Sequence, residues 1–315
     1  MKKFITKIVL FIFIVGVIII AAFFLMNSIV RIKADFKIKK QTKYIVVGHS
    51  HAECAFNDSL IGDFENFCNS GESYFYTLPK VKNLISQNPG IETVFIEFSN
   101  NQIIKEMNDW IWDEKHMSYY YPTHSPFIGF KDNALLVEKN FKVFLSTMPI
   151  DIKNLGRLIA KRDFNYSYNY GGYISLNKVL NGNDFAKRLY SYHNVDFNSV
   201  SDYSVLYLKQ IIDFCLAHKK KVYLVRSPFY KAYPGIKNEK LFQEIREKNF
   251  LAIEFLDFGR VPFQMTDYAD LEHLNKQGSA KFSKWFDDLI KKGLLDQKDK
   301  QQFIEDNVCG LSGFH

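Results

Sequence analysis

The longest apolar stretch of the chain lies at its start. From residue 4 to residue 26 only Thr6, Lys7 and Gly16 interrupt the apolar pattern. Such a run is long enough to cross a hydrocarbon core of about 30 Å as a helix. A cleaved signal peptide has a shorter apolar region that ends at a small-residue site, whereas Ala21 lies inside this run. Residues 1–26 are therefore predicted to be a short tail and an uncleaved, single-pass membrane anchor.

Positive charges flank this anchor on both sides. Lys2, Lys3 and Lys7 precede the apolar run, and six Lys or Arg residues follow it between residues 31 and 43. The excess after the run places the following domain in the cytoplasm by the positive-inside rule. A long domain can be translocated regardless of charge, however, and so short a tail usually stays inside. We expect the domain outside the cytoplasm, joined to the anchor by a basic linker over residues 27–43.

Alternating strand and helix patterns begin at Tyr44. Residues 44–47 and 93–98 are apolar runs of the kind that form buried strands. Between them, the spacing of apolar residues predicts helices over 57–67 and 74–88, with a short strand at the apolar step near Cys68. Strands that alternate with helices indicate a parallel sheet.

The alternation resumes at Ser201 and continues almost to the end of the chain. The expected elements are helices over 205–217, 239–248 and 276–291 and strands over 221–225 and 252–256. The predicted α/β domain covers residues 44–296. Residues 297–315 are polar and are expected to form a frayed tail.

An aromatic segment of about residues 105–200 interrupts this alternation. Tyrosines gather at 119–121 and again at 166–173, and helical spacing recurs over 133–147 and 152–161. Aromatic rings stack well on the apolar faces of sugars, so the insertion could form a binding wall or a lid. We favour the simpler interpretation that these rings form a small core of the insertion itself.

Composition and charge exclude several classes of protein. The chain has 315 residues, of which 47% are hydrophobic, so wholesale disorder is excluded. The formal net charge is +7, but the lysines are scattered and form no dense basic stripe with aromatics, so we expect no nucleic-acid partner. Cys54, Cys68, Cys215 and Cys309 show no CxxC spacing, so no zinc site is expected. We predict no metal and no cofactor.

Two short motifs carry the candidate chemistry. Gly48-His49-Ser50 directly follows the first strand, at the sheet edge where open α/β folds bind ligands. Asp270-Leu271-Glu272-His273 holds a carboxylate and an imidazole three residues apart, so both can face the same way. A serine nucleophile needs an adjacent base, and His273 can take its proton while Asp270 holds the imidazole tautomer.

Each motif also has a plainer interpretation. Ser50 could cap the next helix, and Asp270 with His273 could be a capping pair. His49 and His51 are rival bases, although a ring seldom turns back onto a neighbouring hydroxyl of the same turn. A metal site made of His49, His51 and Asp270 is a further alternative. We predict Ser50, His273 and Asp270 to be catalytic because further motifs accompany them in a fixed order.

Four short blocks follow one another along the chain. They are Gly48-His49-Ser50, Asn69-Ser70-Gly71, Phe98-Ser99-Asn100-Asn101-Gln102 and Asp270-Leu271-Glu272-His273. Their order resembles the SGNH/GDSL hydrolase superfamily, a group of esterases, lipases, carbohydrate acetylesterases and acyltransferases. The resemblance covers Tyr44 to about Asn101 and Lys221 to about Ile290. It implies a three-layer α/β/α, flavodoxin-like parallel sheet, here with a transmembrane helix and a large aromatic insertion added.

The resemblance also implies the parts of an oxyanion hole. The backbone N–H groups of Ser50 and Gly71 and the side-chain amide of Asn101 are the expected donors. Two departures from the family pattern stand out. His49 occupies the place of the aspartate in the first block, and the third block lacks its glycine and its final aspartate.

These observations lead to three hypotheses about function. The first is a membrane-anchored serine esterase or deacylase that acts on an acylated envelope glycan or lipid, with acetyl as the acyl group that the resemblance implies. The second is an O-acyltransferase that modifies a surface polymer with the same residues. The third is a catalytically inactive domain that binds glycan or acts as a scaffold. In each case we expect a single-pass protein of the bacterial inner membrane, inserted through residues 4–26, with its domain outside the cytoplasm.

Overall fold

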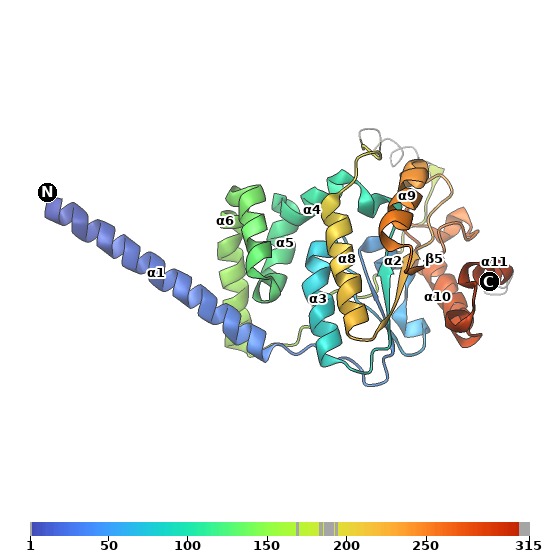
Figure 1. Ribbon diagram of the computed structural model, residues 1–315, viewed down its shortest axis with the longest axis horizontal. Helices are drawn as coiled ribbons and strands as arrows, with labels where there is room; N and C mark the ends of the chain where they lie inside the picture. The colour runs from blue at the N-terminus through green and yellow to red at the C-terminus, as the bar shows by residue number, and fades with distance from the viewer. Residues whose placement is uncertain (1, 168–169, 183–184, 186–191, 193–194, 309–315) are drawn as a thin grey trace. The chain divides into compact units, whose positions relative to one another are not determined.

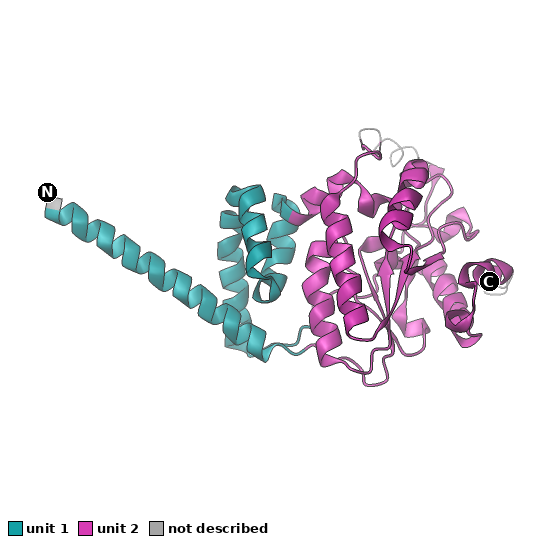
Figure 2. Cartoon of the chain, in the orientation of Figure 1, with its two compact units in different colours: residues 1–35, 112–169 teal, residues 36–111, 170–315 magenta. Residues whose placement is uncertain are grey.

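The chain divides into two units, each formed by two separate stretches of sequence. The computed structural model describes residues 2–308 except 168–169, 183–184, 186–191 and 193–194. One unit, the helical unit, contains residues 1–35 and 112–169, and the other, the sheet unit, contains residues 36–111 and 170–315 (Figure 2).

The sheet unit is built on a five-stranded parallel sheet with the order β2-β1-β3-β4-β5 (Figure 1). Its strands are β1 Tyr44–Val47, β2 Phe64–Asn66, β3 Thr93–Glu97, β4 Lys221–Arg226 and β5 Glu254–Asp257. The register pairs Val46 with Phe95 and Phe95 with Tyr223, so these side chains form one row across the sheet. The parallel sheet expected from the sequence is confirmed.

Helices cover both faces of this sheet. They are α2 Ser50–Ala55, α3 Tyr74–Gln87, α4 Asp109–Trp112 at the junction of the units, α8 Asp202–Ala217, α9 Glu239–Phe250, α10 Lys276–Lys291 and α11 Lys300–Asp306. On one face, Phe282 and Phe286 of α10 pack with Phe56 and with the sheet residue Phe95. On the other face α8 packs against β4, and α3 and α8 lie side by side (Figure 1).

Two predictions for the sheet unit are wrong. Residues 57–67 are not a helix: they contain a single 3₁₀ turn at Asp58–Leu60 and then strand β2. Asp63, with φ of 53°, breaks any helix at this point. Of the predicted frayed tail, residues 297–308 are instead ordered, because α11 buries Ile304 and the Trp285 Nε1–H donates to the Asn307 carbonyl at 3.1 Å, and residues 309–315 lie outside the described residues.

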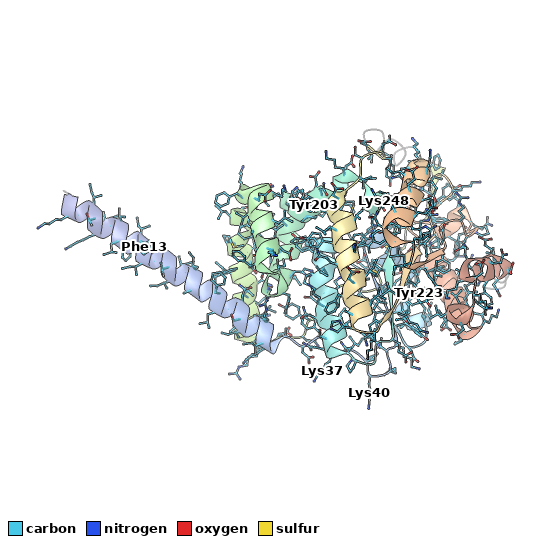
Figure 3. All side chains as sticks on the ribbon, viewed as in Figure 1. Phe13, Lys37, Lys40, Tyr203, Tyr223 and Lys248 are labelled. Carbon is cyan, nitrogen blue, oxygen red and sulfur yellow. The ribbon has the colours of Figure 1, made fainter. Side chains whose placement is uncertain are left out.

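The helical unit begins with α1, Lys2–Lys33. Among the described residues it is the one helix long and apolar enough to cross a membrane, and Phe13 in its apolar stretch is exposed and projects away from other elements (Figure 3). The apolar N-terminal helix is thus confirmed. It continues through residues 27–33, the first part of the predicted linker.

Residues 112–169 of the expected insertion supply the rest of the helical unit, α5 Glu114–His124 and α6 Phe130–Lys161, whereas the remainder of that segment belongs to the sheet unit. Two helices were expected over 133–147 and 152–161; α6 does consist of two helices, but they meet at Asn140, whose φ of −153° and ψ of 72° are not helical. Several insertion rings contact one another, including Tyr121 with Phe144 at 5.4 Å between ring centroids. The expectation that the aromatic residues form a core of their own thus holds for part of the insertion, whereas later rings pack on the sheet unit, for example Tyr192 on Tyr233.

Candidate active site

The turn after β1 is shaped by Gly48. Its φ is +156°, and a Cβ at this position would lie 2.4 Å from the Cβ of Glu97, a separation that real atoms do not reach. Only glycine therefore lets β1 run this close to β3 and turn at once into α2. Ser50 is the first residue of α2 and is partly exposed, whereas His49 and His51 on either side are buried.

Glu97, the last residue of β3, forms hydrogen bonds with this turn. Its Oε2 atom accepts hydrogen bonds from the backbone N–H of His49 at 2.9 Å and of Ala52 at 3.2 Å. The side chain is completely buried, and burial raises the pKa of Glu97 well above the usual carboxyl range despite these two bonds. The turn that carries Ser50 is thus fixed by a group from the neighbouring strand.

Ser50, His273 and Asp270 come together in the structure. The Ser50 Oγ lies 2.7 Å from His273 Nε2, and His273 Nδ1 lies 2.9 Å and 3.0 Å from the two carboxylate oxygens of Asp270. A carboxylate only accepts hydrogen bonds, so Nδ1 carries the proton and Nε2 is left to accept from the Ser50 hydroxyl. This is the arrangement of a serine, a general base and a residue that orients the base.

The loop that carries His273 and Asp270 is held by its own backbone. Asp270 Oδ1 accepts from the N–H groups of Glu272 and His273, at 2.9 Å and 3.0 Å. The His273 carbonyl accepts from the Ala269 N–H at 2.9 Å, which closes the loop. The carboxylate is therefore oriented before it contacts the imidazole ring.

The rival bases have other partners. His49 Nδ1 lies 3.4 Å from the Ser50 Oγ, much farther than His273, and the N–H of His51 also approaches this nitrogen at 3.4 Å. His51 Nε2 pairs with Glu272 Oε2 at 3.0 Å. The distances favour His273 as the base for Ser50.

Gly71 lies on a turn that packs onto the serine turn. Its φ of +78° is left-handed, which suits glycine. The Asn69 N–H donates to the Gly48 carbonyl at 3.0 Å, and the Ser70 hydroxyl donates to Glu53 of α2. Burial raises the pKa of Glu53, and the bond from Ser70 opposes this rise. Two hydrogen bonds therefore tie the block that contains Gly71 to the block that contains Ser50.

Asn101 follows β3 in a 3₁₀ turn, Asn100–Ile103. The Ser99 hydroxyl donates to Asn101 Oδ1 at 2.7 Å, which occupies the carbonyl end of the amide and leaves its NH₂ end to donate elsewhere. The preceding residue, Asn100, is anchored by Arg226, whose Nη1 donates to its Oδ1 at 2.9 Å. The contact with Arg226 thus fixes the position of the turn that carries Asn101.

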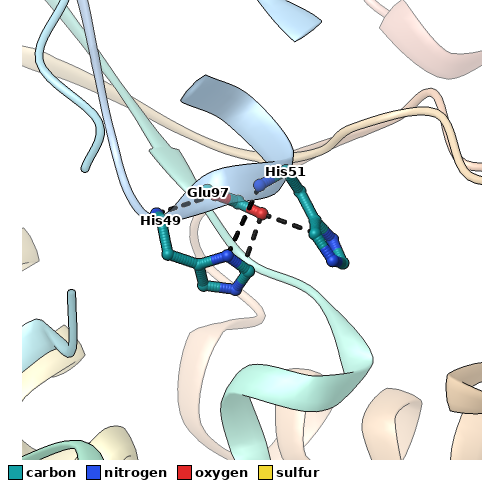
Figure 4. Close-up of side chains that lie close together, drawn as sticks. All are labelled: His49, His51 and Glu97. Carbon is teal, nitrogen blue, oxygen red and sulfur yellow. Dashed lines mark hydrogen bonds and ion pairs between the residues drawn. The ribbon is translucent and has the colours of Figure 1, made fainter. Parts of the chain in front are cut away.

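The two histidines on either side of Ser50 in the sequence form a buried cluster with Glu97 (Figure 4). Glu97 Oε1 is 3.7 Å from His49 Nε2 and 3.6 Å from His51 Nδ1. Burial, together with the nearby His51 and His273, holds the pKa of His49 well below its usual value. Burial also lowers the pKa of His51, although its bond to Glu272 opposes this. All three groups of the cluster therefore favour their uncharged forms.

This cluster has the composition of a metal site. Within the described ranges, two sets of residues place ligand atoms within 4.8 Å of one another: His49, His51 and Glu97, and His51, Glu272 and His273. Asp270, the third member of the set considered from the sequence, binds His273 instead. In the first set, Glu97 already accepts two backbone hydrogen bonds through its other oxygen, so the cluster has a structural role without an ion.

Glu97 and Glu272 were not among the residues singled out from the sequence. A signal for Glu97 was present, since a carboxylate inside the apolar run 93–98 is unusual for a buried strand. Glu272 lies within the Asp270–His273 motif, but nothing in its spacing indicated a bond to His51, 221 positions earlier.

The chain matches no protein-family model, and no curated protein is similar to it in sequence. The inference about function therefore rests on the geometry around Ser50 and on the order of the four blocks.

Proposed function

We propose that this protein is a membrane-anchored serine esterase or deacylase that acts on an acylated envelope glycan or lipid. The observation that supports the proposal most directly is the 2.7 Å contact between the Ser50 hydroxyl and His273 Nε2, with Asp270 on the other ring nitrogen. A serine that only capped α2 would need neither partner. The histidine likewise gains little structural stability from a hydroxyl at the surface of the loop.

The reaction follows from this geometry. Ser50 Oγ attacks the ester carbonyl and gives its proton to His273 Nε2, while Asp270 stabilises the imidazolium. His273 then returns the proton to the leaving oxygen as the C–O bond breaks, which leaves an acyl-serine. A water molecule attacks the acyl-serine by the same steps in reverse and releases the acid. The N–H groups of Ser50 and Gly71 and the amide of Asn101 are the proposed donors to the oxyanion.

The fold is consistent with the family that the four blocks suggest. The strand order β2-β1-β3-β4-β5 is the flavodoxin-like order of doubly wound sheets, which bind ligands beyond the carboxyl ends of their strands. Ser50 follows β1 and Asn101 follows β3 at this edge. We propose that the sheet unit is an SGNH-type hydrolase domain in which His49 has replaced the usual aspartate.

The test is hydrolysis of short-chain p-nitrophenyl esters by the full chain in detergent. Wild type is expected to turn the ester over and Ser50→Ala to lose the activity, with an unchanged circular dichroism spectrum. Ser59→Ala is the matched control, since Ser59 is exposed and its hydroxyl donates to Asn57 nearby. If Ser50→Ala and Ser59→Ala hydrolyse the ester equally well, Ser50 is not the nucleophile.

The same contact fits a second candidate, an O-acyltransferase. Both activities share the acyl-serine, and they differ only in whether water or a hydroxyl of a surface polymer accepts the acyl group. Trapping the acyl-serine with a radiolabelled acyl donor and then adding polysaccharide separates them. Transfer of label to the polymer indicates the transferase, and release as free acid indicates the hydrolase.

We also propose that α1 crosses the bacterial inner membrane and holds the domain outside the cytoplasm. The apolar length of α1 supports the anchor, and the short N-terminal tail supports the orientation. Protease added to intact spheroplasts is expected to digest the sheet unit. Full protection before lysis, with digestion after lysis, would reverse the orientation.

A further inference from the structure

Helix α6 has large apolar side chains on its exposed surface. Phe130 is 88% exposed, Phe141 58% and Leu145 51%, and Ile150 is also exposed. Phe141 and Leu145 are four residues apart, so they lie on one face of the helix. Asn140 interrupts α6, and the helix that follows it, residues 141–161, buries Val143 and Thr147 on the side away from Phe141 and Leu145. This second helix therefore has a packed side and an uncovered apolar side.

Such a concentration of exposed apolar side chains is unusual for a helix in water. In the described part of the sheet unit, the exposed large apolar side chains are scattered, for example Leu206 and Leu216 near the two ends of α8 and Leu251 after α9. Scattered residues of this kind are normal on any protein surface. A contiguous apolar face is not, and it marks a surface that contacts another apolar medium.

The position of α6 within the helical unit indicates that medium. Helix α6 packs against the C-terminal part of α1 (Figure 2). Arg31, in the last turn of α1, donates through Nε to the Pro126 carbonyl at 2.6 Å, four residues before α6 begins. A charged Arg31 is placed at the border of the hydrocarbon core and not within it. The start of α6 therefore lies at the level of this border.

An apolar cavity lies between the same elements. It has a volume of about 470 Å³ and is lined by Phe23 and Phe24 of α1, Phe144 and Met148 of α6, and Phe130 at the start of α6. Its walls are chemically suited to a hydrocarbon chain. Both the cavity and the exposed face of α6 therefore favour lipid as the neighbouring material.

We propose that the second helix of α6, residues 141–161, is an interfacial helix that lies on the bilayer crossed by α1. Its apolar face, defined by Phe141 and Leu145, enters the acyl-chain region together with Phe130 of the preceding helix, and a lipid acyl chain enters the cavity beside it. Exposed lysines of α6, such as Lys131 and Lys142, contact the headgroups. The inference rests on the anchor proposed above and is independent of any activity at Ser50.

Spin labels on the full chain test this inference. The background is Cys309→Ser, because the cysteines at 54, 68 and 215 are buried and escape labelling. Labels are placed at Phe141→Cys and Leu145→Cys, with Lys142→Cys as the matched, adjacent control. The protein is reconstituted in nanodiscs of phosphatidylethanolamine and phosphatidylglycerol, and the accessibility of each label to oxygen and to a water-soluble nickel chelate is measured.

The apolar-face labels are expected to be severalfold more accessible to oxygen than to nickel, and the label at residue 142 to show the reverse. Equal nickel accessibility at 141, 142 and 145 would mean that the face is in water and would overturn the inference. Protection of 141 and 145 from both reagents would mean that protein covers the face, either the rest of the chain or a second copy, and would also overturn it.

A label at Phe13→Cys separates failure of the anchor from failure of the inference. Phe13 lies in the middle of α1 and is 67% exposed. If the label at residue 13 is accessible to oxygen and the label at residue 141 is accessible to the nickel chelate, only the interfacial helix is rejected. Access of nickel at residue 13 rejects the anchor and the interfacial helix together, and leaves the proposed esterase unaffected.

Discussion

Replacing Asp270 with asparagine tests the role of the orienting carboxylate without changing its shape. Asp270 Oδ1 accepts from two backbone N–H groups of its own loop, so the asparagine oxygen is expected to keep this position. The asparagine NH₂ group then takes the place of Oδ2, 3.0 Å from His273 Nδ1. An NH₂ group can only donate, so it favours the tautomer that has its proton on Nε2, whereas the amide oxygen, 2.9 Å from Nδ1, still accepts from the other tautomer. The variant also lacks the negative charge that stabilises the imidazolium, so His273 is a weaker base for Ser50 in either tautomer.

The expected loss in kcat is about 10⁴-fold, which is the size of effect that the wrong tautomer produces in a serine–histidine–aspartate site. The fold should persist, because both backbone hydrogen bonds survive. Initial rates with p-nitrophenyl acetate give kcat, and urea unfolding in detergent micelles gives the stability of the same preparation.

Glu272→Gln is the matched control for Asp270→Asn. It removes a neighbouring carboxylate of the same loop that binds His51 and has no contact with Ser50 or His273 Nδ1 among those described. Its loss in kcat should be far smaller. If Asp270→Asn keeps kcat within about tenfold of wild type, the tautomer argument fails and another group orients His273.

Three further predictions follow from the structure. Gly48→Ala places a Cβ 2.4 Å from Glu97 at a left-handed φ, so we expect a loss of about 2 kcal/mol or more in unfolding free energy together with loss of esterase activity. Burial raises the pKa of Asp151 to about 7, above its unfolded value of 3.8, so its contribution to stability falls as pH rises between these values. The unfolding free energy of wild type should therefore fall by about 2 kcal/mol relative to that of Asp151→Asn when the pH is raised from 5 to 7, as measured by urea unfolding. A difference between the two proteins that stays constant with pH would contradict the assigned pKa. EDTA should leave ester hydrolysis unchanged, because the side chains and backbone N–H groups of the proposed site suffice for the reaction. A loss of activity that zinc restores would instead assign a metal to His49, His51 and Glu97.

Much of the sheet could be predicted because its strands have strong local signals. The apolar runs that become β1, β3 and β4 are buried on both faces, and parallel strands of this kind read as continuous apolar stretches. Helix α10 was predicted over its observed range, 276–291, because its apolar residues repeat with helical spacing and Asn275 caps it. Local pattern and tertiary environment agree at these positions.

Local pattern failed where tertiary contacts decide the structure. Phe64 and Phe67 have a spacing that also fits a helix, but Phe64 pairs with Tyr44 in the sheet and packs on Phe286 of α10. The bend of α6 at Asn140 and the burial of Ile304 in α11 depend on partners distant in sequence. Such partners have no signature in a local window.

The candidate site divides in the same way. Ser50, Asp270 and His273 could be predicted because each lies in a short motif beside a predicted strand or helix. The pairings of Glu97 with the serine turn and of Glu272 with His51 could not, since each joins segments that only the fold brings together. The motifs thus indicated the reacting groups and missed the residues that support them.

The most direct test of the account is covalent labelling by a fluorophosphonate probe. The probe reacts with an activated serine and needs no natural acyl group or acceptor. We predict one adduct per chain, located at Ser50 by peptide mass spectrometry, absent in Ser50→Ala and strongly slowed in His273→Ala. A folded wild-type protein that stays unlabelled at Ser50, or one whose Ser50 is labelled equally fast in His273→Ala, would contradict the proposal that His273 activates this serine.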